Sequence, residues 1–281
     1  MSKTMLKGIH RRAVGISTNN ELMGTSGITA GGDGKPTVMF PGPETVAIFD
    51  DFLGDLLGDE WAFVKGDTGT VSTGVLTTAT NGVLRLTHEP IPLNVSGENL
   101  ALTQGLFKNW KANAAKGGRD GRLRLGARVK IESVSRTAAR QHVFVGFSDS
   151  GGAEFPAYDT GAGVISNAAD LVGFLFSPGG DTGWSLVSAR AGTAQLAVAG
   201  ASYGPSTNTY TTVELEVATN PSDTGGKATF WVDGRIVGKI DSPLTSSVAV
   251  TPWIGFWVQD TGPRFIDIDY VNISAPRDTG M

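Results

Sequence analysis

The chain of 281 residues contains no cysteine, only three histidines and no long hydrophobic run. Without cysteine, neither disulfide bonds nor thiolate metal sites contribute to the structure. His10, His88 and His142 lie far apart without metal-ligand spacing, so we predict no metal site, and no cofactor is expected. No stretch approaches the ~20 apolar residues of a membrane span, and the basic start lacks the apolar region of a secretory signal. We therefore expect a protein that folds in the cytosol and has no membrane partner.

Long stretches with helical periodicity are also scarce, which favours β-structure. Glycine is abundant, with 39 residues, and threonine, valine and serine recur throughout the chain. Many short strand-like segments are separated by turn signals, and no helical crossovers lie between them. This organisation predicts an all-β fold, an antiparallel two-sheet jelly-roll sandwich with an extended N-terminal arm.

Several stretches show the individual strands. GRLRLGARVKIES alternates with a period of two residues, as a strand with one wet face does. HVFVGFSD and LVGFLFSP are apolar on both faces, which is typical of central strands in a packed sandwich. TTVELEVAT alternates again, and KATFWVDGRIVGKI predicts a hairpin that turns at Asp233 and Gly234. In the first stretch the apolar face comprises Leu123, Leu125, Ala127, Val129 and Ile131, and the polar face comprises Arg122, Arg124, Arg128, Lys130 and Glu132.

The tripeptide Asp-Thr-Gly occurs six times and has two interpretations. Aspartic proteases bring two aspartates from such tripeptides side by side, where they share one proton. No two copies here have matching apolar flanks, whereas aspartate and glycine are both favoured in tight turns. We therefore interpret the repeats as turns of a β-protein. They begin at Asp67, Asp159, Asp181, Asp223, Asp260 and Asp278.

Charge is distributed unevenly along the chain. The formal net charge of −4 argues against a nucleic-acid-binding surface over the whole molecule, and we predict no nucleic-acid partner. The first twelve residues nevertheless carry four basic side chains and no acid. A basic arm therefore precedes an acidic body. We divide the chain into an arm over residues 1–46, a jelly-roll domain over 47–275 and a short polar tail over 276–281.

The C-terminal part of the chain carries the most specific pattern. From Tyr210 to Ser274 it contains a TVELEV strand, a FWVDGRIVG hairpin and a closing IDIDYVNI strand. This order resembles the concanavalin-like, laminin-G-like jelly roll. The longer stretch over residues 48–275, from FDDFLGDLLGDEW through HVFVGFSDSGGAEFP and AADLVGFLFSPGGDTGWSLV, resembles a group of tailed-bacteriophage virion proteins. Those proteins combine such a sandwich with an N-terminal extension.

This resemblance implies an auxiliary capsid protein, a decoration or cement subunit on the exterior of the virion. Its arm would bind the major capsid protein, because apolar residues can fill grooves on a neighbour and basic residues can contact its acids. The resemblance also implies a homo-oligomer, with a trimer as the first expectation. The arm residues predicted to bind the capsid are Met5, Leu6, Lys7, Ile9, Arg11, Arg12, Val14 and Ile16.

Glycoside hydrolysis is a rival function, because some enzymes share the concanavalin-like fold and use two carboxylates that flank the scissile bond. Their local motif, Glu-x-Asp-x-x-Glu on one strand, is absent from this chain. The nearest carboxylate pairs, Glu214/Glu216 and Asp267/Asp269, are spaced as the outer face of a half-buried strand. We therefore predict that the protein has no catalytic residues and is not an enzyme.

Carbohydrate binding is the alternative function, as in a lectin-like receptor-adhesion protein of the phage tail or head fibre. Such a protein needs exposed aromatic rings that stack on sugars. Tryptophans in sandwiches are more often part of the core. Of the six tryptophans, Trp110 has the most polar surroundings and is the predicted contact for a glycan or an interface.

An acidic segment between residues 50 and 60 raises the question of calcium. Its acids lack the Asp-x-Asp-x-Asp-Gly spacing of a known calcium loop. This favours a solvated edge over a calcium site. The acids are Asp50, Asp51, Asp55, Asp59 and Glu60.

Overall fold

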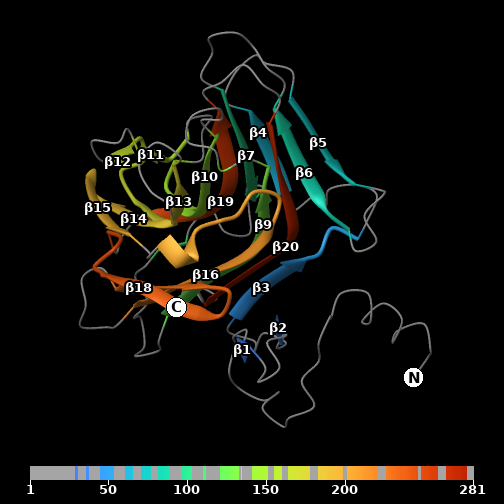
Figure 1. Ribbon diagram of the computed structural model, residues 1–281. Coiled ribbons are helices and arrows are strands. Elements are labelled where there is room, and N and C mark those ends of the chain that lie inside the picture. The colour runs from blue at the N-terminus through green and yellow to red at the C-terminus, as the bar shows by residue number, and fades with distance from the viewer. Residues whose placement is uncertain are drawn as a thin grey trace, which may run out of the picture.

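The computed structural model consists of two eight-stranded antiparallel sheets packed face to face, which confirms the predicted all-β jelly-roll sandwich (Figure 1). The 3₁₀ turn Ala201–Tyr203 is the helical element of the described part, which has no helix long and apolar enough to cross a membrane. The structure describes residues 29–30, 36–37, 45–53, 61–65, 71–76, 82–88, 96–102, 110–111, 121–132, 134, 141–150, 155–159, 164–177, 183–198, 201–219, 226–245, 248–258 and 264–276.

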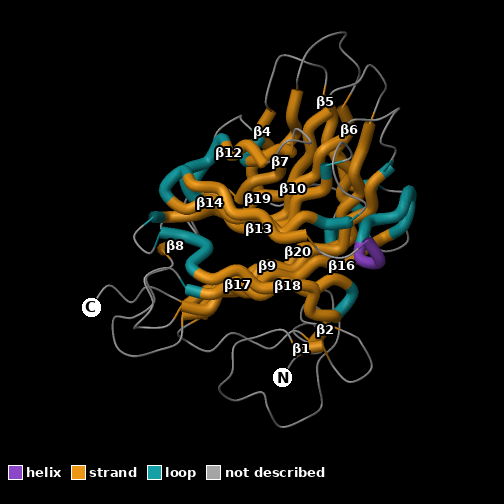
Figure 2. Tube along the Cα trace, turned by 60° about the vertical axis from the view of Figure 1, so that its left-hand side comes forward, coloured by secondary structure: helices purple, strands orange, loops and turns teal. Residues whose placement is uncertain are grey.

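Figure 2 shows the two layers of the sandwich. One layer, which we call the β10 sheet after its central strand, has the order β15-β14-β13-β10-β19-β7-β4. The short strand β8 also pairs with β19. The strands are β4 (Trp61–Lys65), β7 (Ser96–Leu102), β8 (Trp110–Lys111), β10 (Gln141–Ser148), β13 (Leu171–Phe176), β14 (Ser185–Arg190), β15 (Thr193–Val198) and β19 (Ala249–Val258).

The other layer, which we call the β9 sheet, has the order β18-β17-β16-β9-β20-β6-β5, and β3 also pairs with β20. Its strands are β3 (Thr45–Asp50), β5 (Val71–Val75), β6 (Leu84–His88), β9 (Gly121–Ile131), β16 (Tyr210–Thr219), β17 (Lys227–Val232), β18 (Arg235–Asp241) and β20 (Arg264–Pro276). Two small hairpins are formed by β1 (Thr29–Ala30) with β2 (Pro36–Thr37) and by β11 (Ala157–Asp159) with β12 (Val164–Ser166).

The inner faces of the two sheets form the main core. All five residues predicted to share the apolar face of β9, from Leu123 to Ile131, are buried with exposed fractions of at most 5%. Phe174 of the β10 sheet meets Phe230 of the β9 sheet edge-on, with ring centroids 5.2 Å apart. The predicted alternation of β9 is therefore confirmed, and aromatic contacts join the two layers.

The outer face of the β10 sheet is also buried, over strands β10, β13, β14 and β19. Phe155, which precedes β11, covers this face and contacts Trp253 edge-on at 5.1 Å between ring centroids. This second apolar layer explains why HVFVGFSD and LVGFLFSP are apolar on both faces. Most described tryptophans are buried, as predicted for a sandwich: Trp253 and Trp257 in this second layer, and Trp61 and Trp184 in the main core.

The predicted hairpin at Asp233 and Gly234 is confirmed. Both residues have positive φ, 48° and 75°, as a two-residue turn of type I′ requires. Asp233 exchanges hydrogen bonds with Thr212 of the neighbouring strand: its backbone N–H donates to the Thr212 carbonyl at 2.8 Å, and its Oδ1 accepts from the Thr212 N–H at 2.9 Å. The turn is thereby fixed beside the outer face of the β9 sheet.

The interpretation of the Asp-Thr-Gly repeats as turns stays a prediction. Asp159 ends β11, and the aspartates of the other five copies lie outside the described residues. The acidic segment between residues 50 and 60, predicted as a solvated edge, is not fully solvated. Its first two acids, Asp50 and Asp51, are half-buried. Asp50 accepts hydrogen bonds from the Phe52 N–H at 2.8 Å and from the Trp61 indole N–H at 2.7 Å. Its carboxylate therefore fixes the end of β3, while Asp55, Asp59 and Glu60 lie outside the described residues.

Candidate functional site

The outer face of the β9 sheet carries ion pairs between neighbouring strands. The basic side chains come mainly from the polar face of β9, and the acids come from β16 and β20 on either side of it. Arg124 donates to Glu216 at 2.6 Å, and Arg128 donates to Asp269 at 2.5 Å. Lys130 lies 2.6 Å from the buried carboxylate of Asp267. This face is therefore an ordered charged surface, in contrast to the apolar outer face of the β10 sheet.

Gly126 interrupts the row of basic side chains on β9. It occupies the outward position between Arg124 and Arg128, and its register partners are Glu214 on β16 and Asn272 on β20. A Cβ atom placed on Gly126 would lie 3.7 Å from the Glu214 Cγ and 3.8 Å from the Asn272 amide nitrogen, which are ordinary van der Waals distances. The glycine therefore leaves open the space that a basic side chain would otherwise fill.

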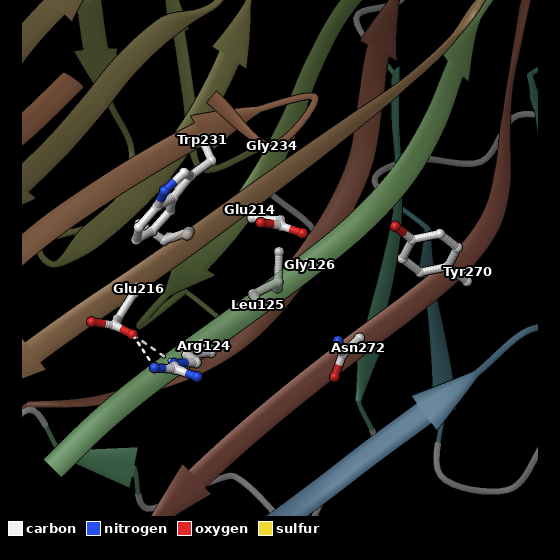
Figure 3. A pocket seen from close by; sticks show the side chains of 10 residues that line it. Arg124, Leu125, Gly126, Glu214, Glu216, Trp231, Gly234, Tyr270 and Asn272 are labelled. Carbon is white, nitrogen blue, oxygen red and sulfur yellow. Dashed lines mark hydrogen bonds and ion pairs between the residues drawn. The ribbon is translucent and has the colours of Figure 1, made fainter. Parts of the chain in front are cut away.

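A pocket of about 210 Å³ lies over this glycine (Figure 3). Trp231 of β17 is the register partner of Glu214 on β16. Trp231 lies on one side of Glu214 and Tyr270 of β20 lies on the other (Figure 3). The lining also includes Gly126 of β9, Asn272 of β20 and Gly234 of the turn after β17. The pocket thus combines two aromatic rings with a carboxyl and an amide group, which come from the adjacent strands β17, β16 and β20.

The two glutamates of β16 differ in their electrostatic surroundings. Glu216 is held by Arg124, whose Nη2 lies 2.5 Å from its Oε2, and by Arg122 at 3.6 Å. Glu214 faces the glycine and makes no ion pair with any residue that the structure describes. Burial raises the pKa of Glu214, and the charge of Arg124 offsets part of this rise. The site therefore holds one carboxylate paired with arginines beside one carboxyl group that is partly desolvated.

Tyr270 is fixed from two directions. Its ring stacks on Phe49 of β3, with centroids 6.0 Å apart and an interplanar angle of 28°. Its hydroxyl is hydrogen-bonded to the Thr212 side chain, and burial raises the pKa of that hydroxyl above its ordinary value. The phenol therefore keeps its proton, and its position beside the pocket is set by contacts to β3 and β16.

This pocket was not predicted from the sequence. Glu214 and Glu216 do share the outer face of a strand, as predicted, but Trp231 was one tryptophan among six and remains partly exposed. The alternation of TTVELEVAT and KATFWV identified the outward residues. The missing signal was Gly126, the residue that breaks the basic face of β9.

The structure does not describe the side chains of the residues predicted as binding sites. Trp110 is in β8, where its backbone pairs with Val250 of β19, and its side chain is outside the described residues. Its predicted contact with a glycan or an interface stays a prediction. The same holds for the capsid-binding arm, the oligomer and the virion location. The arm residues Met5, Leu6, Lys7, Ile9, Arg11, Arg12, Val14 and Ile16 are all outside the described residues.

No protein-family model and no curated protein matches the sequence, but solved structures match the fold. An endo-1,3-beta-glucanase from Streptomyces sioyaensis is 15% identical, with a TM-score of 0.52 over 85% of this chain and 99% of that one. A GlcNAcα1-4Gal releasing endo-β-galactosidase from Clostridium perfringens is 13% identical, with a TM-score of 0.53 over 85% of this chain and 64% of that one. Peanut lectin is 13% identical, with a TM-score of 0.51 over 83% of this chain and 97% of that one.

These neighbours correct one prediction and leave another without support. The prediction that the protein is not an enzyme is wrong, because this fold also occurs in enzymes: two of the three structures named above are glycan-cleaving enzymes. The missing Glu-x-Asp-x-x-Glu motif excludes one arrangement of carboxylates on one strand, not every arrangement that the fold can bring together. None of the three is a virion protein. What the likeness establishes is the fold, a concanavalin-like jelly roll.

Proposed function

We propose that the protein binds carbohydrate and that the pocket over Gly126 is its sugar subsite. The observation that carries this proposal is the pairing of two aromatic rings, Trp231 and Tyr270, across a pocket that also presents Glu214 and Asn272. Aromatic faces suit the apolar face of a sugar ring, while carboxyl and amide groups form hydrogen bonds with hydroxyl groups. A lectin among the similar structures supports the choice of ligand.

The size of the pocket sets the length of sugar that it holds. Its volume of about 210 Å³ is below the ~300–1,000 Å³ of pockets that enclose drug-sized ligands. We therefore expect one sugar ring in the pocket, with the rest of an oligosaccharide lying along the charged face of the β9 sheet. Once an oligosaccharide is long enough to reach both the pocket and this face, additional sugar units should not increase its affinity.

Blocking the pocket should abolish binding without unfolding the protein. The wild-type protein is first screened on a glycan array, and its best ligand is then titrated by calorimetry. Gly126→Val should remove measurable binding, because its side chain fills the space above the glycine. Trp231→Ala should weaken binding by about fivefold to tenfold, the loss expected for one aromatic contact.

Gly74→Val is the matched control for the steric block. Gly74 lies on β5 of the same sheet, is exposed, and has no heavy atom within 4 Å of an added Cβ. This variant should bind like the wild type. If no glycan binds the wild-type protein, or if Gly126→Val and Gly74→Val bind alike, the pocket is not a sugar subsite.

Glycoside hydrolysis is the second candidate, and the contrast between Glu214 and Glu216 favours it. Two carboxyl groups with different surroundings can act as acid and base. Glu214 would donate its proton to the glycosidic oxygen. Glu216 would take a proton from water, whose oxygen attacks the anomeric carbon as its bond to the leaving oxygen breaks. Two shorter sugars result, and solvent then restores a proton to Glu214 and removes one from Glu216.

Release of reducing ends from a bound oligosaccharide tests the second candidate. If hydrolysis occurs at this site, Glu214→Gln should slow it by about a hundredfold or more, because the acid is lost. Asp241→Asn on β18 removes an exposed carboxylate of the same sheet outside the pocket and should leave the rate unchanged. Binding without any release of reducing ends would contradict hydrolysis and leave the binding function standing.

A further inference from the structure

The pocket has a carboxyl group, Glu214, that no cation of the described residues pairs with directly. Arg124 is paired with Glu216, and Arg128 is paired with Asp269. Between these two arginines lies Gly126, and opposite it lies Glu214. The outward positions of β9 before and after Gly126 carry basic side chains. Gly126 carries none, so a cation is missing from this row opposite Glu214.

We propose that the pocket binds an ammonium group and that its ligand is an amino sugar, an inference that rests on the proposed carbohydrate-binding function. The ammonium group would occupy the space over Gly126 and pair with Glu214, in the place that a lysine or arginine of β9 would otherwise take. A sugar that carries a carboxylate would instead meet the negative charges of Glu214 and Glu216. The geometry therefore favours a cationic ligand over an acidic one.

The aromatic rings beside Glu214 support this choice. A cation within about 6 Å of an aromatic ring centre is attracted by the negative face of the ring. The same sheet already uses this contact, because the Arg128 guanidinium lies 4.7 Å and the Lys130 ammonium 5.2 Å from the ring centre of Tyr210. In the pocket, Trp231 and Tyr270 would provide this attraction for the ammonium group of a bound sugar.

The proposal also fixes the direction of the pH dependence. The titratable and charged groups around Glu214 are Arg124 and Arg128 from β9, Tyr270 from β20, and Glu216 from the same strand, while β17 presents an uncharged tryptophan. Because burial raises the pKa of Glu214, this carboxyl takes up its proton at a higher pH than an exposed glutamate does. Binding should therefore weaken as the pH falls through the pKa of Glu214, and weaken again at high pH as the amine loses its proton.

Three sugars that differ only in the substituent at C2 of each ring test the inference. They are the β-1,4-linked tetramers of glucosamine, N-acetylglucosamine and glucose, titrated calorimetrically into the wild-type protein at a pH above the pKa of Glu214 and below the pKa of the sugar amines. The glucosamine tetramer should bind about tenfold more tightly than the other two, as expected for an ion pair with a cation–π contact. In Glu214→Gln this preference should disappear, while the weaker binding of the neutral tetramers remains.

A second variant places the cation in the protein itself. Gly126→Lys restores a basic residue to the interrupted row, and its ammonium can pair with Glu214, so the variant should lose the glucosamine tetramer. Gly74→Lys adds the same charge at an open position of the same sheet and should keep the preference. Asp241→Asn removes a negative charge outside the pocket and should also keep it. Thermal melting of each variant verifies that it is folded.

The outcomes separate this inference from the function on which it rests. Equal affinity for the three tetramers, or a preference that persists in Glu214→Gln, overturns the amino-sugar inference. If a neutral sugar still binds and Gly126→Val abolishes that binding, the carbohydrate-binding function stands without it. If no sugar binds the wild-type protein at all, both are wrong.

Discussion

Replacing Asp267 by asparagine is expected to lower the free energy of unfolding by about 3 kcal/mol, because it breaks a buried ion pair on one side only. The Asp267 side chain is 1% exposed. Its Oδ1 accepts from the Arg85 Nε at 2.6 Å, and its Oδ2 lies 2.9 Å from the Arg85 Nη2 and 2.6 Å from the Lys130 Nζ. Without this carboxylate, two cations remain close together with no anion between them.

The matched control is Asp241→Asn, on β18 of the same sheet. Asp241 also pairs with a lysine, Lys227, at 3.0 Å, but its side chain is 82% exposed. Water already solvates both partners, so this substitution should change the free energy of unfolding by less than about 1 kcal/mol. Urea denaturation of both variants measures the difference. Similar losses in the two variants would show that burial does not decide the contribution of these pairs.

Truncating Phe174 to alanine is expected to cost about 3–5 kcal/mol of folding free energy, the range for a large core aromatic residue. Phe174 is fully buried on the inner face of the β10 sheet. Its ring contacts Trp184 at 5.9 Å and Phe230 of the opposite sheet at 5.2 Å, both edge-on. Alanine would remove the contact between the layers and leave a cavity that the surrounding rings cannot fill.

Two further variants test whether the loss of folding free energy comes from the buried aromatic ring. Phe174→Leu keeps most of the apolar volume and should cost clearly less than Phe174→Ala. Ile236→Ala removes a side chain that is 56% exposed and should change stability by no more than about 0.5 kcal/mol. Denaturation curves for the three proteins give the order. If Phe174→Ala and Ile236→Ala were equally stable, the aromatic contact between the sheets would not stabilise the sandwich.

Local sequence patterns were enough to predict several strands and the faces of their side chains. The period of two residues along β9 placed Leu125 inward and Arg124 outward, and the structure has both where the pattern predicts them. The Asp-Gly pair at Asp233 likewise predicted the turn between β17 and β18. These features depend on neighbours within a few residues, because alternation and turn conformation are set by local backbone geometry.

Which outward residues share a site depends on how distant strands pair. Glu214 meets Gly126, Trp231 and Asn272 through the register of four strands, and those residues lie far apart along the chain. A shift of one residue in any pairing would turn that strand's side chains to the other face and dissolve the pocket. The alternation of a single strand carries no information on its register with distant partners. The pocket, the ion pairs around it and the unpaired carboxyl group of Glu214 therefore follow from long-range strand pairing, which the packing of the two apolar layers selects.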